Sequence, residues 1–266
     1  MASVHRVRKP LSVLWPFVAG TTAVVLVWQI IVWMKLKPTS EIPSPGMVLD
    51  ALRDLWNDGV MLGAMWNSLH RGVLGFFLSI VIATPLGLLV ALVKPVRSFV
   101  RPILSALQQL PSVSWVPISI VLFGTSSTTV YAIILLGAVP SIANSLLSGI
   151  DLVPPSHIRA ARMLGLRGVR SVRRVILPAA MPGYLTGLEQ GWAFAWRSLM
   201  AAELIATTGD LGSGLGNILT EGRNSQNMSL MLAGVALVLA CGLLVEKAGF
   251  SPLRKRVLST RGLAVA

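Results

Sequence analysis

Long apolar runs, separated by short polar segments, dominate the pattern of this chain. Residues 11–34 form the first run, and residues 72–93 form the second, between Arg71 and Lys94. A stretch of 49 uncharged residues, 102–150, follows. A helix rises about 1.5 Å per residue and needs about 20 apolar residues to cross a bilayer, so this stretch is too long for one crossing. The pattern therefore predicts membrane-spanning helices, with more than one of them in residues 102–150.

A polar cluster, GTSSTT at residues 124–129, divides this stretch into two spans, 102–123 and 130–150. Two further runs follow, of which 179–205 contains charges and 228–245 does not. The sequence thus predicts an all-α membrane protein with six transmembrane helices. The composition agrees, because 54% of the residues are hydrophobic and only 12% are charged, whereas soluble domains carry about 25% charged residues.

The predicted organisation is a tail at 1–10, a single transmembrane domain at 11–246 and a basic tail at 247–266. Basic residues precede the first apolar run, as they do in a secretory signal peptide. That run is 24 residues long, however, and it lacks a clear small-x-small cleavage site. We therefore expect residues 11–34 to be retained as the first span.

Positive charge is distributed unevenly between the loops. Four segments together hold 17 of the 23 Lys and Arg residues and two of the ten acidic residues: 1–10, 94–101, 151–178 and 246–266. The segments that alternate with them hold five basic and six acidic residues: 35–71, 124–129 and 206–227. Because Lys and Arg collect in cytoplasmic loops, both termini are predicted to be cytoplasmic. This topology accounts for the net charge of +13 without a nucleic-acid partner.

The first outer loop contains a short amphipathic pattern. Turn residues open it, and apolar residues then occupy positions 48, 49, 52, 55 and 56, close to helical spacing. We expect a short amphipathic helix at the outer surface or at the membrane interface, with Trp56 and Trp66 as interfacial anchors.

The loop at 151–178 has six arginines and one acidic residue. Ser156 is a candidate N-cap for a helix over 157–164, and Gly165 permits a turn. A second helix is predicted over 168–176, and Pro178 is expected to end it before the next span. The apolar side of this second helix is assigned to Val169, Val172, Val175 and Ile176. Composition alone leaves two partners open for these arginines, anionic lipid and an acidic protein surface.

Here the sequence resembles a known family. AARMLG at 160–165 and VILP at 175–178 resemble the "EAA" motif in permease subunits of bacterial ABC importers, in which Glu-Ala-Ala is followed by a glycine and then by Ile-x-Leu-Pro. Arg159 stands where the motif has its glutamate, and Val175 replaces the isoleucine. LSALQQLPSVSWVPISIVLFG, GWAFAWRSLMAAELI and LGSGLGNIL are similar to segments of importers for nitrate, taurine and aliphatic sulfonates.

The resemblance implies a type I ABC importer permease in the bacterial plasma (inner) membrane. It implies two copies of the permease, with a homodimer expected, two cytoplasmic ATP-binding subunits and an extracytoplasmic solute-binding protein. ATP and Mg²⁺ would be bound by the ATP-binding subunits, and no cofactor by this chain. The substrate would be a small oxyanion such as an alkanesulfonate, taurine or nitrate. The residues that would couple to the ATP-binding subunit are Arg159, Ala160, Ala161, Gly165, Arg167, Arg170, Val175, Leu177 and Pro178.

Polar residues within the spans are candidates for a translocation path, because an intramembrane charge costs roughly 2.5–3.5 kcal/mol on insertion scales. Ser141, Asn144, Ser145 and Ser148 recur near helical spacing; they fit either a polar passage or close packing of small residues. The charged candidates are Glu189, Arg197 and Glu203. For Arg197, pairing with an acidic residue and contact with an anionic substrate both remain open. Prolines at 111, 117 and 140 predict kinks along the passage.

The sequence lacks the residues that several kinds of chemistry require. LGSGLG at 211–216 has no lysine, so it is not a phosphate-binding loop of the G-x-x-x-x-G-K-[ST] type. The single cysteine and the scattered histidines predict no metal site, and we expect no catalytic residues and no enzymatic activity in this chain. The alternative function is a secondary transporter driven by an ion gradient, with Glu189, Arg197 and Glu203 as its relay.

Overall fold

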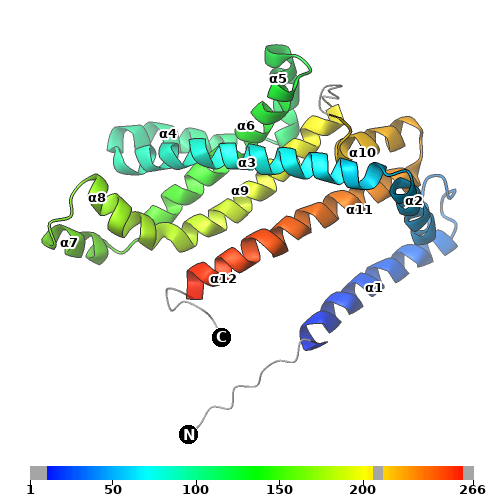
Figure 1. Ribbon diagram of the computed structural model, residues 1–266, viewed down its shortest axis with the longest axis horizontal. Coiled ribbons are helices and arrows are strands. Elements are labelled where there is room, and N and C mark those ends of the chain that lie inside the picture. Colours follow the sequence, from blue (N-terminus) through cyan, green and yellow to red (C-terminus); the bar gives the residue numbers. More distant parts are fainter. Residues whose placement is uncertain (1–10, 206–211, 260–266) are drawn as a thin grey trace, which may run out of the picture.

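The computed structural model describes residues 11–205 and 212–259 of the chain. Expectations for the tail at 1–10, for 206–211 and for 260–266 lie outside these residues. Within the described ranges every regular element is helical and there is no strand (Figure 1). The predicted all-α class is therefore confirmed.

The helices are given in chain order. They are α1 (Leu11–Trp33), α2 (Pro45–Asn57), α3 (Val60–Leu92), α4 (Lys94–Leu107), η1 (Ser112–Ser114), α5 (Trp115–Phe123), α6 (Ser127–Asp151), α7 (Pro155–Met163), α8 (Val169–Ser171), the π-helical turn η2 (Val172–Ile176), α9 (Leu177–Ile205), α10 (Leu215–Asn224), α11 (Met228–Val245), the π-helical turn η4 (Glu246–Phe250) and α12 (Ser251–Ser259).

Among the described residues, three helices are long and apolar enough to cross a membrane: α3, α6 and the continuous helix Met228–Val257. A fourth candidate is α4 together with Ser112–Phe123, a pair that is bent by 98°. Helix α1 contributes a shorter apolar helix, Val18–Trp33, and α9 is 29 residues long with three charged residues. The number of six spans thus stays a prediction, while the helical membrane fold is established.

The predicted span 102–123 is not one straight helix. The chain leaves α4 after Leu107, and Pro111 then adopts an extended conformation (φ −58°, ψ 137°) ahead of η1. Proline lacks an N–H and disfavours helical geometry in the residue before it. The break therefore falls at one of the predicted kinks, and α5 projects away from the bundle (Figure 1).

Two other helices are longer than their predicted spans. Helix α3 begins at Val60, so that Arg71 lies inside the helix and not at its end. At the other end of the chain, helical structure continues beyond residue 245 through η4 and α12 to Ser259. Phe250 in η4 is buried, and it packs edge-on against Phe76 with ring centroids 5.9 Å apart. This apolar contact holds the first part of the predicted basic tail against the bundle.

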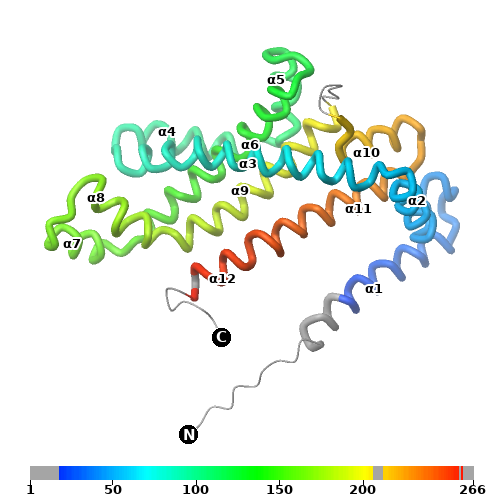
Figure 2. The backbone as a smooth tube through the Cα atoms, in the orientation of Figure 1, coloured from blue at the N-terminus to red at the C-terminus, as the bar shows by residue number. Residues whose placement is uncertain are grey.

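The centre of the bundle is formed by α6 packed against α9, with α3 beside them (Figure 2). Small residues allow the close approach: a Cβ added to Gly183 would lie 3.1 Å from the Cα of Gly149. A Cβ at Gly191 would overlap the side chain of Ile142. Small residues at such contacts let membrane helices approach closely enough for extensive van der Waals packing.

The two ends of the bundle differ in chemistry. The junction of α3 and α4 lies at the same end as α7 and α8, whereas α2 and α10 lie at the opposite end (Figure 1). The arginine-rich segments 94–101 and 151–178 thus share one end of the molecule, as their predicted topology requires. The orientation of this end in a membrane remains a prediction.

The amphipathic helix of the first loop is confirmed as α2. Ser44 caps it by accepting a hydrogen bond from the N–H of Met47 at 3.3 Å, and Pro45 occupies its first turn. Val48 and Leu55 are buried, while Trp56 is exposed. Trp66 lies on α3 and is exposed as well.

Substitution of Gly191 by alanine tests the contact between α6 and α9. Alanine normally stabilises a helix interior relative to glycine, but here its Cβ would overlap Ile142, and overpacking typically costs about 1–3 kcal/mol. We expect Gly191→Ala to lower the thermal unfolding temperature of the detergent-purified protein. Gly63→Ala, where the added Cβ meets nothing within 4 Å, is the control and should not lower it. Equal unfolding temperatures for the two variants would contradict the packing described.

Candidate functional site

The basic loop begins with a short helix and a glycine turn. Helix α7 starts at Pro155, with Pro154 at its N-cap, so the predicted cap Ser156 is wrong. The reason is that proline's fixed φ suits the first helical position, which brings the start of the helix forward. The predicted turn is confirmed: Gly165 has φ +75°, and the N–H of Leu166 donates to the carbonyl of Ala161 at 2.9 Å. This is the usual glycine-terminated end of a helix.

The second helix of the loop is continuous with α9. Helix α8 passes through the π-helical turn η2 directly into α9, so Pro178 does not end the helix as expected. A π turn shifts the hydrogen-bond ladder by one residue, and here it lies just before the proline, whose missing N–H would otherwise interrupt that ladder. Val172 and Ile176 are buried and Val175 is half-buried, as predicted, whereas Val169 is 79% exposed.

The surface of the loop is both basic and apolar. All six arginines are exposed: Arg159, Arg162, Arg167, Arg170, Arg173 and Arg174. At the turn, Met163 is 88% and Leu164 is 79% exposed. Of the predicted coupling residues, Ala160 is exposed and Ala161 is buried, while Leu177 and Pro178 are half-buried in the first turn of α9. The loop thus presents positive charge around an apolar tip.

A polar cleft of about 540 Å³ lies between α4, α6 and α9. It is lined by Arg101, Ser105, Gln108, Asn144, Ser145, Ser148, Gly149, Leu152, Gly183, Thr186, Gly187 and Gln190. Three members of the predicted polar stripe, Asn144, Ser145 and Ser148, therefore meet on it. The fourth, Ser141, is fully buried, and its hydroxyl makes no hydrogen bond to the described part of the chain.

The amide of Asn144 links two walls of the cleft. Its Nδ2 donates to Ser105 Oγ at 3.0 Å and to Gln108 Oε1 at 3.1 Å, both on the α4 side. Sequence reasoning missed this wall, and it also missed Thr186 and Gln190 on α9. The sequence could have indicated Thr186 and Gln190 as a polar pair, because residues spaced four apart lie on the same face of a helix.

The three charged candidates do not converge. Glu189 lies 3.4 Å from Arg254 of α12. The Nε of Arg197 donates to the carbonyl of Ala193 at 3.0 Å, and its guanidinium lies 4.7 Å from the centre of the Phe194 ring. Arg197 borders a separate, mainly apolar cavity of about 740 Å³ between α9 and α11. A relay through these charges and Glu203 therefore has no support in this arrangement.

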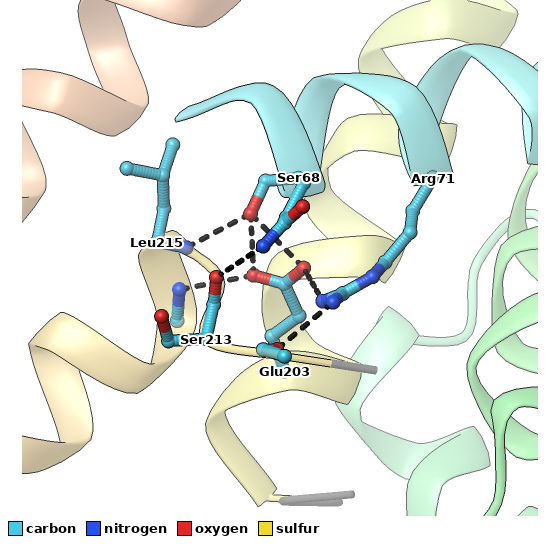
Figure 3. A network of polar contacts seen from close by, with 8 residues as sticks. Ser68, Arg71, Glu203, Ser213 and Leu215 are labelled. Carbon is cyan, nitrogen blue, oxygen red and sulfur yellow. Dashed lines mark hydrogen bonds and ion pairs between the residues drawn. The ribbon is translucent and has the colours of Figure 1, made fainter. Parts of the chain in front are cut away.

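Glu203 forms the centre of a buried polar network (Figure 3). It is 3% exposed, and its Oε1 lies 2.8 Å from Nη1 of Arg71, which is 5% exposed. Ser68 Oγ donates to the carboxylate at 2.8 Å, and the N–H of Gly216 donates at 3.0 Å. Nη2 of Arg71 also donates to the carbonyl of Gly212 at 2.9 Å. A buried charge is tolerated when it is paired and hydrogen-bonded in this way.

This network ties α3, α9 and the start of α10 together. Ser68 Oγ accepts from the N–H of Leu215 at 2.8 Å, and a Cβ at Gly216 would overlap the side chain of Glu203. The absence of a side chain at Gly216 therefore allows the backbone of this segment to lie directly against Glu203. Arg71 escaped sequence reasoning because it was assigned to the boundary of a span; its position inside the long helix α3 is what requires a partner.

Residues 83–247 match the family described as "Binding-protein-dependent transport system inner membrane component". The chain belongs to this family, and it is a permease subunit of an ABC importer, as its EAA-like loop indicated.

Individual relatives agree with this assignment. The chain is 32% identical over 261 residues to the taurine transport system permease protein TauC of Escherichia coli, covering 96% of this chain and 93% of that protein. It is 25% identical over 240 residues to the bicarbonate transport system permease protein CmpB of Synechococcus elongatus, covering 86% and 84%. The fold is similar to that of the MetNI methionine ABC transporter, with a TM-score of 0.62, 21% identity, and 74% of this chain and 95% of that chain covered.

Substitution of Glu203 by glutamine tests the buried network. The variant removes the carboxylate that pairs with the buried Arg71, and breaking a buried pair in this way costs about 3–5 kcal/mol. We expect a marked fall in the thermal unfolding temperature of the purified protein. Glu41→Gln is the control, because it removes an exposed ion pair with Lys37, and it should leave the temperature unchanged. Wild-type stability of Glu203→Gln would show that the pair does not hold these helices together.

Proposed function

We propose that this chain forms the membrane path of an ATP-driven importer for a small oxyanion. One observation carries the proposal: the helix that begins in the exposed basic loop also lines the polar cleft. Helices α8, η2 and α9 form one continuous rod, and Thr186 and Gln190 on α9 face the cleft. A displacement of the loop can therefore be transmitted to the cleft, because the helical segments between them are contiguous.

The basic loop is the proposed contact with the ATP-binding subunits. Its exposed arginines and the apolar tip at Met163 and Leu164 suit an acidic groove with an apolar floor on a protein partner. Arg159 occupies the glutamate position of the family motif, so its contact is proposed to be with an acidic residue of the partner. The other proposed coupling residues are Ala160, Ala161, Gly165, Arg167, Arg170, Val175, Leu177 and Pro178.

The proposed assembly has two copies of this chain, two cytoplasmic ATP-binding subunits and an extracytoplasmic solute-binding protein. ATP and Mg²⁺ bind to the ATP-binding subunits, and this chain binds no cofactor of its own. The chain spans the bacterial inner membrane with the basic loop in the cytoplasm. The arginines that gather at the α7 end of the bundle support this orientation, because Lys and Arg collect on the cytoplasmic side.

The oxyanion is proposed from the relatives and from the cleft. TauC and CmpB are named for taurine and bicarbonate, and both solutes carry a charged oxyanion group. The cleft is lined by hydroxyl and amide side chains, among them Asn144 and Ser148 of the predicted path. Uptake of radiolabelled taurine, methanesulfonate and bicarbonate into proteoliposomes that contain the whole transporter tests the proposal. Uptake of at least one solute that depends on ATP is the expected result, and uptake driven by an ion gradient without ATP would contradict it.

Replacement of Gly165 by proline tests the coupling role of the loop. Proline cannot adopt the φ of +75° found there, and it removes the hydrogen bond from the Gly165 N–H to the carbonyl of Arg162. We expect the variant to insert into membranes but to lose most ATP-driven uptake in proteoliposomes, while ATP hydrolysis continues.

Gly59→Pro provides a matched control at the opposite end of the bundle. Gly59 has φ +70°, and its N–H donates to the carbonyl of Trp56 at 3.1 Å, the same length as the bond lost at Gly165. The control suffers the same local strain outside the loop and should retain coupling. Equal loss of uptake in both variants would indicate general damage and would remove the support for coupling through the loop.

A further inference from the structure

Three charged side chains meet where α4 passes the end of α6. Nη2 of Arg97 donates to both carboxylate oxygens of Asp151, at 2.7 and 2.6 Å. Nη1 of Arg101, one helical turn along α4, donates to Oδ2 of Asp151 at 2.8 Å. All three side chains are only partly exposed, between 30% and 40%. Two guanidinium groups thus share a single carboxylate, which leaves one positive charge in excess.

Of these three residues, Arg101 alone lines the polar cleft. It is also the one charged side chain among the described residues that do so. The remaining polar lining consists of hydroxyl and amide side chains: Ser105, Gln108, Asn144, Ser145, Ser148, Thr186 and Gln190. The excess charge of the cluster therefore faces a cleft whose described lining contains no acidic residue to neutralise it.

The geometry leaves Arg101 free to bind a second anion. The carboxylate of Asp151 already has both of its oxygens on Arg97, so it keeps a counter-ion without Arg101. A guanidinium carries five N–H donors in a planar fork, of which Arg101 directs one group, Nη1, to Asp151. The remaining donors match the spacing of oxygen atoms on a sulfonate or a carboxylate.

We propose that Arg101 is the anion-binding residue of the cleft. A small oxyanion binds to its guanidinium and receives further hydrogen bonds from the hydroxyl groups of α6 and α9 and from the amide of Gln190. The charge of Arg101 selects anions over neutral molecules of similar shape, and the short polar side chains limit their size. This inference rests on the proposed transport of an oxyanion and assigns the residue that recognises it within the membrane subunit.

Direct binding to the complete transporter, without ATP and without the solute-binding protein, tests the assignment. The probes are ¹³C-labelled methanesulfonate, taurine and bicarbonate, and binding is followed by NMR line broadening. Dimethyl sulfone serves as a neutral analogue of methanesulfonate. We expect the wild-type complex to bind at least one of the three anions and not the sulfone. Binding of none of them, or equal binding of the sulfone, would overturn the proposal.

Two arginine variants separate recognition from structure. Arg101→Gln should weaken binding at least about tenfold, because the anion loses its charge-assisted hydrogen bonds to the guanidinium. Arg97→Gln removes the same charge from the cluster but not from the cleft lining. Because Arg101 then becomes the counter-ion that Asp151 keeps, we expect weaker binding than in the wild type but a clearly smaller loss than in Arg101→Gln. Equal weakening by both variants, or wild-type affinity in Arg101→Gln, would overturn the role of Arg101.

A third variant covers the case in which Arg101→Gln does not fold. Arg101→Lys keeps the positive charge and its pairing with Asp151 but loses the fork, so we expect weaker binding with an unchanged thermal unfolding temperature. Undiminished binding by a folded Arg101→Lys together with a misfolded Arg101→Gln would assign Arg101 to the fold only. The proposed function is judged separately: if ATP-binding subunits do not copurify with the wild-type chain, that function fails whatever the anion data show.

Discussion

The close packing of α6 against α9 is the constraint on which the rest of the structure depends. Gly149 and Gly183 bring the two backbones together, and the fully buried Ile142 of α6 packs against Gly191 of α9. In a bilayer, the helices gain little from hiding apolar surface, because lipid tails are equally apolar; close van der Waals contact stabilises their association instead. A loss of this contact would open the polar cleft, because both helices line it.

Helix α9 connects these three features along a single rod. Its first turn continues from the basic loop through the π-helical turn η2, its middle part lines the polar cleft, and its last turns carry Glu203 into the network with Arg71. The network holds the end remote from the loop against α3 and the segment 212–216. One end of the helix is therefore firmly held, while the other begins in an exposed loop with glycine turns at Gly165 and Gly168. This difference suits a lever that moves at the loop.

Polar side chains within the helices fall into two groups with different surroundings. Glu203, Arg71 and Ser68 are buried and fully engaged with one another, which is how a protein tolerates charge in an apolar environment. Ser148 and Arg101 border a cleft, and Arg101 directs only its Nη1 group to Asp151. The first group holds helices together, and the second is available to a ligand. Of these residues, Glu203 and Ser148 were treated alike by sequence reasoning as candidates for a path.

Sequence alone determined the helical membrane class, the amphipathic helix α2, the turn at Gly165 and membership in a family of importer permeases. Each of these follows from local pattern: apolar runs, helical spacing, a glycine in a basic loop and short motifs. Tertiary structure alone decided that Glu203 pairs with Arg71, that Asn144 reaches α4, and that Arg101 shares Asp151 with Arg97. Residues 132, 39 and 50 positions apart meet in these contacts. Their partners depend on how the helices pack, and the order of residues along one helix carries no information about which neighbour will face it.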